Sequence, residues 1–177
     1  MTLRTPLAAA AAILALSTTT AAQAQAASCL TEKEVSGLVV YAMPSVIDAT
    51  QTSCSNQLTG RGFLASGGTK MAQRYAARSD ATWPQAKSAF FKLGKLKPKD
   101  TQMFAQLPDE AVRPLLDALI VQMVAQEIKP GSCRNIERLV QALDMLEPEQ
   151  AGTLTGVIAS LALTGDKEVQ MCPERQS

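Results

Sequence analysis

The stretch from Val112 to Ile128 constrains the fold of this chain more than any other. Its apolar residues recur with the i, i+3, i+4, i+7 spacing of an α-helix, at positions 112, 115, 116, 119, 120, 123 and 124. Further apolar residues extend this surface over most of the helix circumference, which is typical of a helix surrounded by others. Asp117 and Glu127 interrupt the run, so it is too short to cross a bilayer, which takes about 20 apolar residues. The pattern predicts the central helix of a small all-α domain.

The rest of the chain predicts further helices separated by glycine and proline breaks. No segment shows the alternating β-branched pattern of a strand. We therefore expect an all-α fold, a single compact bundle of about six to seven helices stapled by disulfides. The expected helices cover 31–53, 69–78 and 83–93, a short stretch after 100, 109–128, a stretch after 132, and 148 to about 163.

The first of these helices has a well-defined start. Thr31 is its predicted N-cap, and Glu34 three residues later completes a capping box. Pro44 lies inside an apolar pattern that keeps its phase, which predicts a kink rather than an end. The expected inward stripe is formed by Val35, Leu38, Val39, Ala42, Met43, Val46 and Ile47.

The last helix carries two distinct stripes. Its larger apolar residues predict an inward face formed by Leu154, Val157, Ile158 and Leu161. Gly152, Gly156 and Ser160 recur at four-residue spacing, and small residues in that pattern let two helices pack closely. We expect this close packing inside the fold. Two other helices predict inward faces at Trp83, Ala86, Phe90 and Leu93, and at Ile136, Leu139, Val140 and Leu143.

The N-terminus has the three regions of a secretory signal peptide. Arg4 supplies the positive charge, residues 6–16 are mostly Ala and Leu, and small residues around Ala24 and Ala26 suit cleavage. We therefore predict a signal peptide at 1–26, a single helical domain at 27–177, and a periplasmic or secreted location. A lipoprotein box at Cys29 is a weaker alternative, because its usual leucine is missing.

Four isolated cysteines follow the predicted cleavage site: Cys29, Cys54, Cys133 and Cys172. An even set in an oxidising compartment predicts two structural disulfides. Cys29 and Cys54 flank one predicted helix whose ends lie roughly 33 Å apart at ~1.5 Å per residue, whereas a disulfide needs Cα atoms within about 7 Å. Each therefore reaches Cys133 or Cys172, and both such pairings remain open.

The charge is unevenly distributed along the chain. Residues 61–100 contain nine basic and two acidic residues, and residues 61–104 hold six of the seven aromatic residues. Basic and aromatic residues together suit an anionic, partly apolar partner such as a membrane surface or an acidic protein. The predicted contact residues are Lys70, Arg74, Arg78, Lys92, Lys95, Lys97, Lys99, Trp83 and Phe91. The plain alternative is that this segment lies against acidic neighbours in the same fold.

The composition points away from catalysis. There is no histidine, which removes the commonest general base and the Ser-His and Cys-His pairs. The sequence predicts no metal site, no cofactor and no nucleic-acid partner. We expect a non-catalytic interaction or structural protein; the alternative is a carrier of a small apolar ligand held between helices, with methionines as an adaptable lining.

Overall fold

The structure is a computed structural model that describes residues 29–58, 60–94, 103, 106–166 and 169–173. The predicted signal peptide, Lys95, Lys97, Lys99 and most of the predicted helix after Asp100 lie outside these residues.

The described residues form seven α-helices, one 3₁₀ turn and no strand, which confirms the all-α prediction. An isolated parallel bridge joins Leu30 to Met171. The elements are α2 (Glu32–Cys54), α3 (Phe63–Ser66), α4 (Gly68–Ala76), α5 (Ser79–Leu93), α7 (Asp109–Glu127), the 3₁₀ turn η1 (Pro130–Ser132), α8 (Cys133–Leu143) and α9 (Pro148–Ala162).

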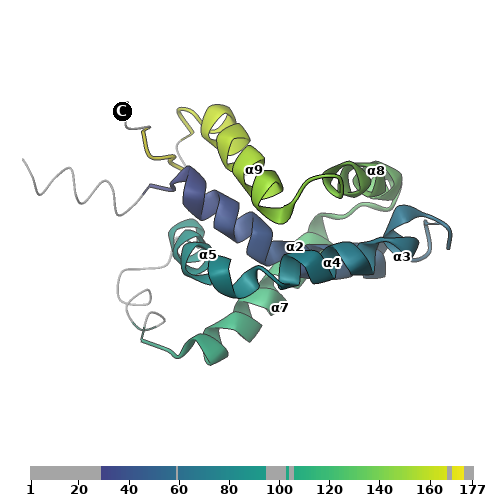
Figure 1. Cartoon of the computed structure of the whole chain (residues 1–177), viewed down its shortest axis with the longest axis horizontal. Coiled ribbons are helices and arrows are strands. Elements are labelled where there is room, and N and C mark those ends of the chain that lie inside the picture. The colour runs from purple at the N-terminus through teal and green to yellow at the C-terminus, as the bar shows by residue number, and fades with distance from the viewer. Residues whose placement is uncertain (1–28, 59, 95–102, 104–105, 167–168, 174–177) are drawn as a thin grey trace, which may run out of the picture.

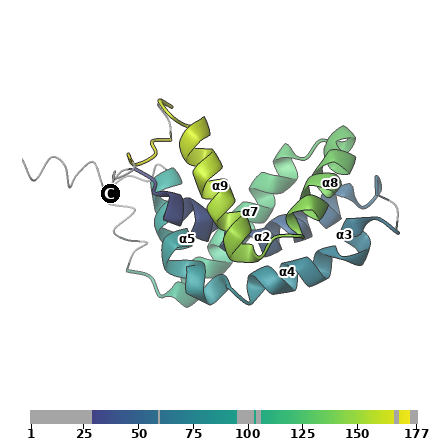
Figure 2. The same cartoon turned by 45° about the horizontal axis from the view of Figure 1, so that its top comes forward.

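Helix α2 is the centre of the fold. Helices α4, α5, α7 and α9 all pack against it, as Figures 1 and 2 show from two directions. The prediction that the helix at 112–128 is central was wrong, because α7 buries only Val112 and Leu116 and lies at the periphery. An apolar pattern around most of a helix does not distinguish a helix covered on all sides from one with an exposed apolar face.

The predicted start of α2 is confirmed. The Thr31 hydroxyl accepts a hydrogen bond from the Glu34 backbone N–H, and the Glu34 carboxylate accepts one from the Thr31 N–H. The helix continues through Pro44 to Cys54, as predicted. Its inward stripe was predicted only in part: Met43 and Ile47 are buried, but the rest of the predicted stripe is half-buried. The buried set also includes Val40, Tyr41, Ala49 and Thr50.

Helix α9 packs on α2 through its small residues. A Cβ at Gly156 would lie 2.7 Å from the Glu32 carbonyl oxygen, and a Cβ at Gly152 would lie 2.9 Å from the Ser36 carbonyl oxygen. The predicted close packing is therefore confirmed. The prediction that Leu154, Val157, Ile158 and Leu161 point inward was wrong, because this stripe lies on the opposite side of the helix and is exposed. Leu139 of α8 and Leu93 of α5 are likewise exposed, whereas Val140, Trp83 and Ala86 are buried as predicted.

Two disulfides staple the bundle. Cys29 bonds to Cys172 and Cys54 bonds to Cys133, which confirms that Cys29 and Cys54 do not pair and resolves the alternative left open. The bonded residues are 143 and 79 positions apart in the sequence. In the chain-entropy model, loops of this size stabilise the folded state by about 4–5 kcal/mol each.

The buried side chains form two clusters on different sides of α2. One contains Val40, Met43 and Ile47 with Met71 and Tyr75 of α4 and Val140 of α8. The other contains Tyr41 with Trp83 of α5 and Val112 and Leu116 of α7. These clusters fix the inward side of each helix, and therefore also decide which residues face solvent.

Candidate functional site

Three of the predicted anion-contacting residues form ion pairs within the fold. Arg74 lies 2.6 Å from Asp144, Arg78 lies 3.0 Å from Glu149, and Lys92 lies 2.7 Å from Glu34. In each pair the basic residue comes from the basic segment and the acidic residue from a flanking segment. The charge asymmetry of the sequence is thus partly neutralised inside the molecule.

Lys92 is the most deeply placed of these basic residues. Its ammonium group donates hydrogen bonds to the Cys29 carbonyl oxygen and to both carboxylate oxygens of Glu34, at 2.7–2.8 Å. Ser88 donates a further hydrogen bond to Glu34. Burial alone raises the pKa of Glu34, but the hydrogen bonds from Lys92, Ser88 and Thr31 outweigh burial and leave that pKa below its usual value. This network joins α5 to the beginning of α2.

The aromatic members of the predicted site belong to the second core cluster. Trp83 is 3% exposed, its ring centroid lies 5.0 Å from that of Tyr41, and the Arg113 guanidinium lies 4.8 Å from the Trp83 ring. Phe91 is half-buried and packs against the same cluster. Burial raises the pKa of Tyr41, and the nearby Asp117 carboxylate raises it further. These rings serve the packing of α2, α5 and α7 rather than a surface.

Of the remaining predicted contacts, Lys70 is exposed on α4, and Lys95, Lys97 and Lys99 lie outside the described residues. The structure therefore does not gather the six described members of this set into one surface. Contact with an anionic protein or membrane stays a prediction.

A different feature is conspicuous on the surface, an apolar stripe along α9. We call this stripe the α9 outer face; it consists of Leu154, Val157, Ile158 and Leu161, whose exposed fractions lie between 39% and 73%. The sequence has no charged residue between Glu149 and Asp166. Large contiguous apolar patches are uncommon on monomers and mark interaction sites.

Helix α7 carries a second exposed apolar stripe. Leu115, Leu119 and Met123 are 42% to 63% exposed. Arg113 of the same helix turns toward α5, where it bonds to Asp80. Helices α7 and α9 both pack on α2 and extend from it in different directions (Figure 2). Among the described residues, the large exposed apolar side chains thus all lie in the C-terminal half of the chain.

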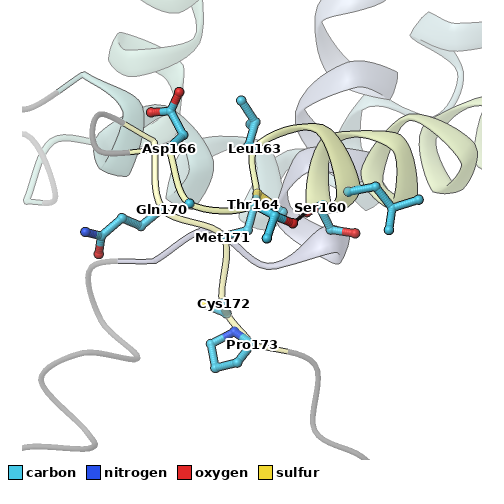
Figure 3. Close-up of a pocket in the computed structure, with 10 residues that line it drawn as sticks. Ser160, Leu163, Thr164, Asp166, Gln170, Met171, Cys172 and Pro173 are labelled. Atoms are coloured by element: carbon cyan, nitrogen blue, oxygen red, sulfur yellow. Dashed lines mark hydrogen bonds between the residues drawn. The ribbon is translucent and has the colours of Figure 1, made fainter.

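A surface hollow of about 780 Å³ lies where α9 ends and the C-terminal segment returns toward α2 (Figure 3). Its lining is mixed, with Ser160, Thr164, Asp166 and Gln170 beside Leu163 and Met171. The hollow is formed by one helix end and the segment that follows it. It therefore differs from the cavity between helices that the carrier alternative requires.

Within the described ranges, no cluster of three or more His, Cys, Asp or Glu side chains is arranged to hold a metal ion. The helices of the same ranges include none with the length and apolar character needed to cross a membrane.

Comparison with known proteins gives no relative: no family model, no curated protein and no solved structure matches the chain.

Sequence reasoning missed the α9 outer face, although the sequence contains a signal for it. The Gly152, Gly156 and Ser160 stripe and the larger apolar stripe lie on roughly opposite sides of one helix at 3.6 residues per turn. In a helix packed on one neighbour, only one of the two stripes can face inward. The smaller residues allow the closer approach, so the larger ones are left outside.

Proposed function

We propose that this chain is an exported, non-catalytic interaction protein that binds a partner protein through the α9 outer face. The observation that carries this proposal is the exposed stripe of four large aliphatic side chains on a helix whose other side is fixed against α2. Fully burying such a side chain is worth about 1.5–3 kcal/mol. Burying the exposed parts of these four side chains against a partner would therefore contribute to the free energy of binding.

Export forms part of the same proposal. The signal-like N-terminus and the two disulfides are both compatible with an oxidising compartment. The disulfides also hold the ends of α2 to the C-terminal half of the chain, which presents α9 on a rigid support. Rigid presentation lowers the entropic cost of binding.

Site-specific photocrosslinking in the producing cells tests the proposal. A photoreactive amino acid at Ile158 should give a discrete adduct to another protein, whereas the same group at the exposed Gln73 of α4 should not. Both positions are exposed, so neither substitution should affect folding. Equal adduct patterns at Ile158 and Gln73, or none at either, would count against the α9 outer face as a binding surface.

A further inference from the structure

The two disulfides differ in how far solvent reaches them. Cys54 and Cys133 are both 0% exposed, so a reagent in solution reaches neither of their sulfur atoms while the protein is folded. Cys29 is 7% exposed, whereas Cys172 is only half-buried and is the most exposed of the four. Thiol–disulfide exchange begins when a thiolate reaches one of the two sulfur atoms, so its rate depends on access. The Cys29–Cys172 bond is therefore the more open to exchange, and its accessible end is Cys172.

The surroundings of Cys172 leave room for a reacting molecule. Cys172 lines the hollow of about 780 Å³ at the end of α9, between Met171 and Pro173 (Figure 3). Sites that bind small molecules usually measure about 300–1,000 Å³, so the hollow has the size to admit a small thiol compound. The buried Cys54–Cys133 bond has no comparable approach.

The segment that carries Cys172 is held lightly. Residues 169–173, which we call the C-terminal segment, lie beside the beginning of α2 (Figure 1). The Leu30 N–H donates a hydrogen bond to the Gln170 carbonyl oxygen and the Cys172 N–H donates one to the Leu30 carbonyl oxygen, each at 2.8 Å. Neither core cluster of the described residues includes a member of this segment. The disulfide is therefore the strongest described link between the C-terminal segment and α2.

The rest of the bundle has contacts of its own. Helix α9 packs on α2 through its small residues, and the Ser160 hydroxyl donates a hydrogen bond to the Glu32 carboxylate at 2.6 Å. Lys92 donates a hydrogen bond to the Cys29 carbonyl oxygen, which holds Cys29 at the beginning of α2. Opening the bond would thus leave Cys29 and α9 in place and free Cys172.

We propose that the Cys29–Cys172 disulfide is a redox-sensitive switch. A dithiol reduces it through Cys172 while the Cys54–Cys133 bond stays intact, and the reduction releases the C-terminal segment from α2. The switch works without any partner at the α9 outer face.

The reaction is a two-step thiol–disulfide exchange. A thiolate of the dithiol attacks the Cys172 sulfur, the bond between the two cysteine sulfurs breaks, and Cys29 leaves as a thiolate. The second thiolate of the reductant then attacks the mixed disulfide, which releases Cys172 and leaves the dithiol oxidised to a disulfide. Each attacking thiol gives its proton to water and each released cysteine takes one up. Two electrons pass from the dithiol to the protein.

Graded reduction of the full mature protein tests the selectivity. Dithiothreitol, a small dithiol, is added to the oxidised protein at one fixed pH without denaturant. Excess N-ethylmaleimide in urea then alkylates every free thiol, and mass spectrometry of the digested protein identifies the reduced cysteines. Cys29 and Cys172 should be reduced at least roughly ten-fold faster than Cys54 and Cys133. The matched control is reduction in concentrated urea, where both bonds are accessible and should be reduced at similar rates.

Hydrogen exchange tests the release of the C-terminal segment. Cys29→Ser combined with Cys172→Ser opens the bond without a bulky label. The backbone amides of Leu30 and position 172 should exchange within roughly ten-fold of the rate of an unstructured peptide in this variant, and much more slowly in the oxidised wild type. Amides of α2 around Ile47, which is 0% exposed, should stay protected in both proteins.

Three results would overturn the switch. The first is reduction of both bonds at equal rates in the native protein, or of the Cys54–Cys133 bond first. The second is protection at Leu30 and position 172 that survives in the double serine variant, because other contacts would then hold the segment. The third is a loss of protection around Ile47 as well, because the bond would then stabilise the whole bundle. None of these results affects the proposed function, which the crosslinking experiment at Ile158 decides separately.

Discussion

Replacing Lys92 by methionine should destabilise the protein more than any other single lysine change among the described residues. The substitution keeps the aliphatic stem but removes the ammonium group, which bonds to Cys29 and to both oxygens of Glu34. The Lys92 and Glu34 side chains are only 16% and 13% exposed, so solvent replaces the lost contacts poorly. Hydrogen bonds to charged groups and partly buried ion pairs give an expected loss of about 2–4 kcal/mol in the free energy of unfolding.

Urea unfolding of the oxidised protein measures this loss. With a typical slope of about 2 kcal/mol per molar urea, the midpoint should fall by about 1–2 M while the slope stays unchanged. Lys70→Met is the matched control, because Lys70 is exposed on α4 and should shift the midpoint very little.

The effect should also depend on pH. The pKa of Glu34 is lowered below its ordinary value of 4.5 in the folded protein, so its contribution to stability is present above that value and lost as pH falls through the folded pKa. Protonation of Glu34 removes the ion pair from the wild-type protein but favours the variant, in which a buried carboxylate has lost its cation. The difference between Lys92→Met and wild type should therefore shrink on acidification below about pH 4.5. A Lys92→Met midpoint equal to that of Lys70→Met, or a large difference that is constant with pH, would refute the reasoning.

Three further outcomes follow from the packing. Gly156→Ala should cost about 1–3 kcal/mol in urea unfolding, because its Cβ would lie 2.7 Å from the Glu32 carbonyl oxygen; an unchanged midpoint would mean that α9 is less closely packed. Replacing Cys54 and Cys133 together by serine should cost about 4 kcal/mol, and a loss below about 1 kcal/mol would show that the disulfide adds little. Ile158→Ser should change the unfolding free energy by less than about 0.5 kcal/mol and leave the circular dichroism unchanged, since a large loss would place this side chain in the core.

The sequence predicted the local features of the fold well. The capping box at Thr31, the passage of α2 through Pro44 and the break after α7 depend on neighbouring residues, and local chemistry determines them. The exclusion of a Cys29–Cys54 disulfide needed only the length of one helix.

The sequence did not predict which helix is central or which side of α9 faces inward. Both depend on contacts between distant segments, such as Gly156 against Glu32. A pattern of apolar residues gives the position of a stripe but not its neighbour, so the α9 outer face was assigned to the core. The partners of the basic segment could not be assigned from the sequence for a related reason, because Arg74 and Lys92 meet their acidic partners only after folding.

The disulfide between Cys29 and Cys172, with the bridge from Leu30 to Met171 beside it, changes how the molecule bears mechanical load. A pull applied to the chain on either side of this bond travels through two sulfur atoms instead of through the helices. The residues between the two cysteines, which stand 143 positions apart in the sequence, are thereby shielded from tension, because a covalent bond carries it. With the bond intact, a force that pulls the two ends of the chain apart would extend only the chain outside Cys29 and Cys172. After reduction of the bond, the same force would draw α9 away from α2.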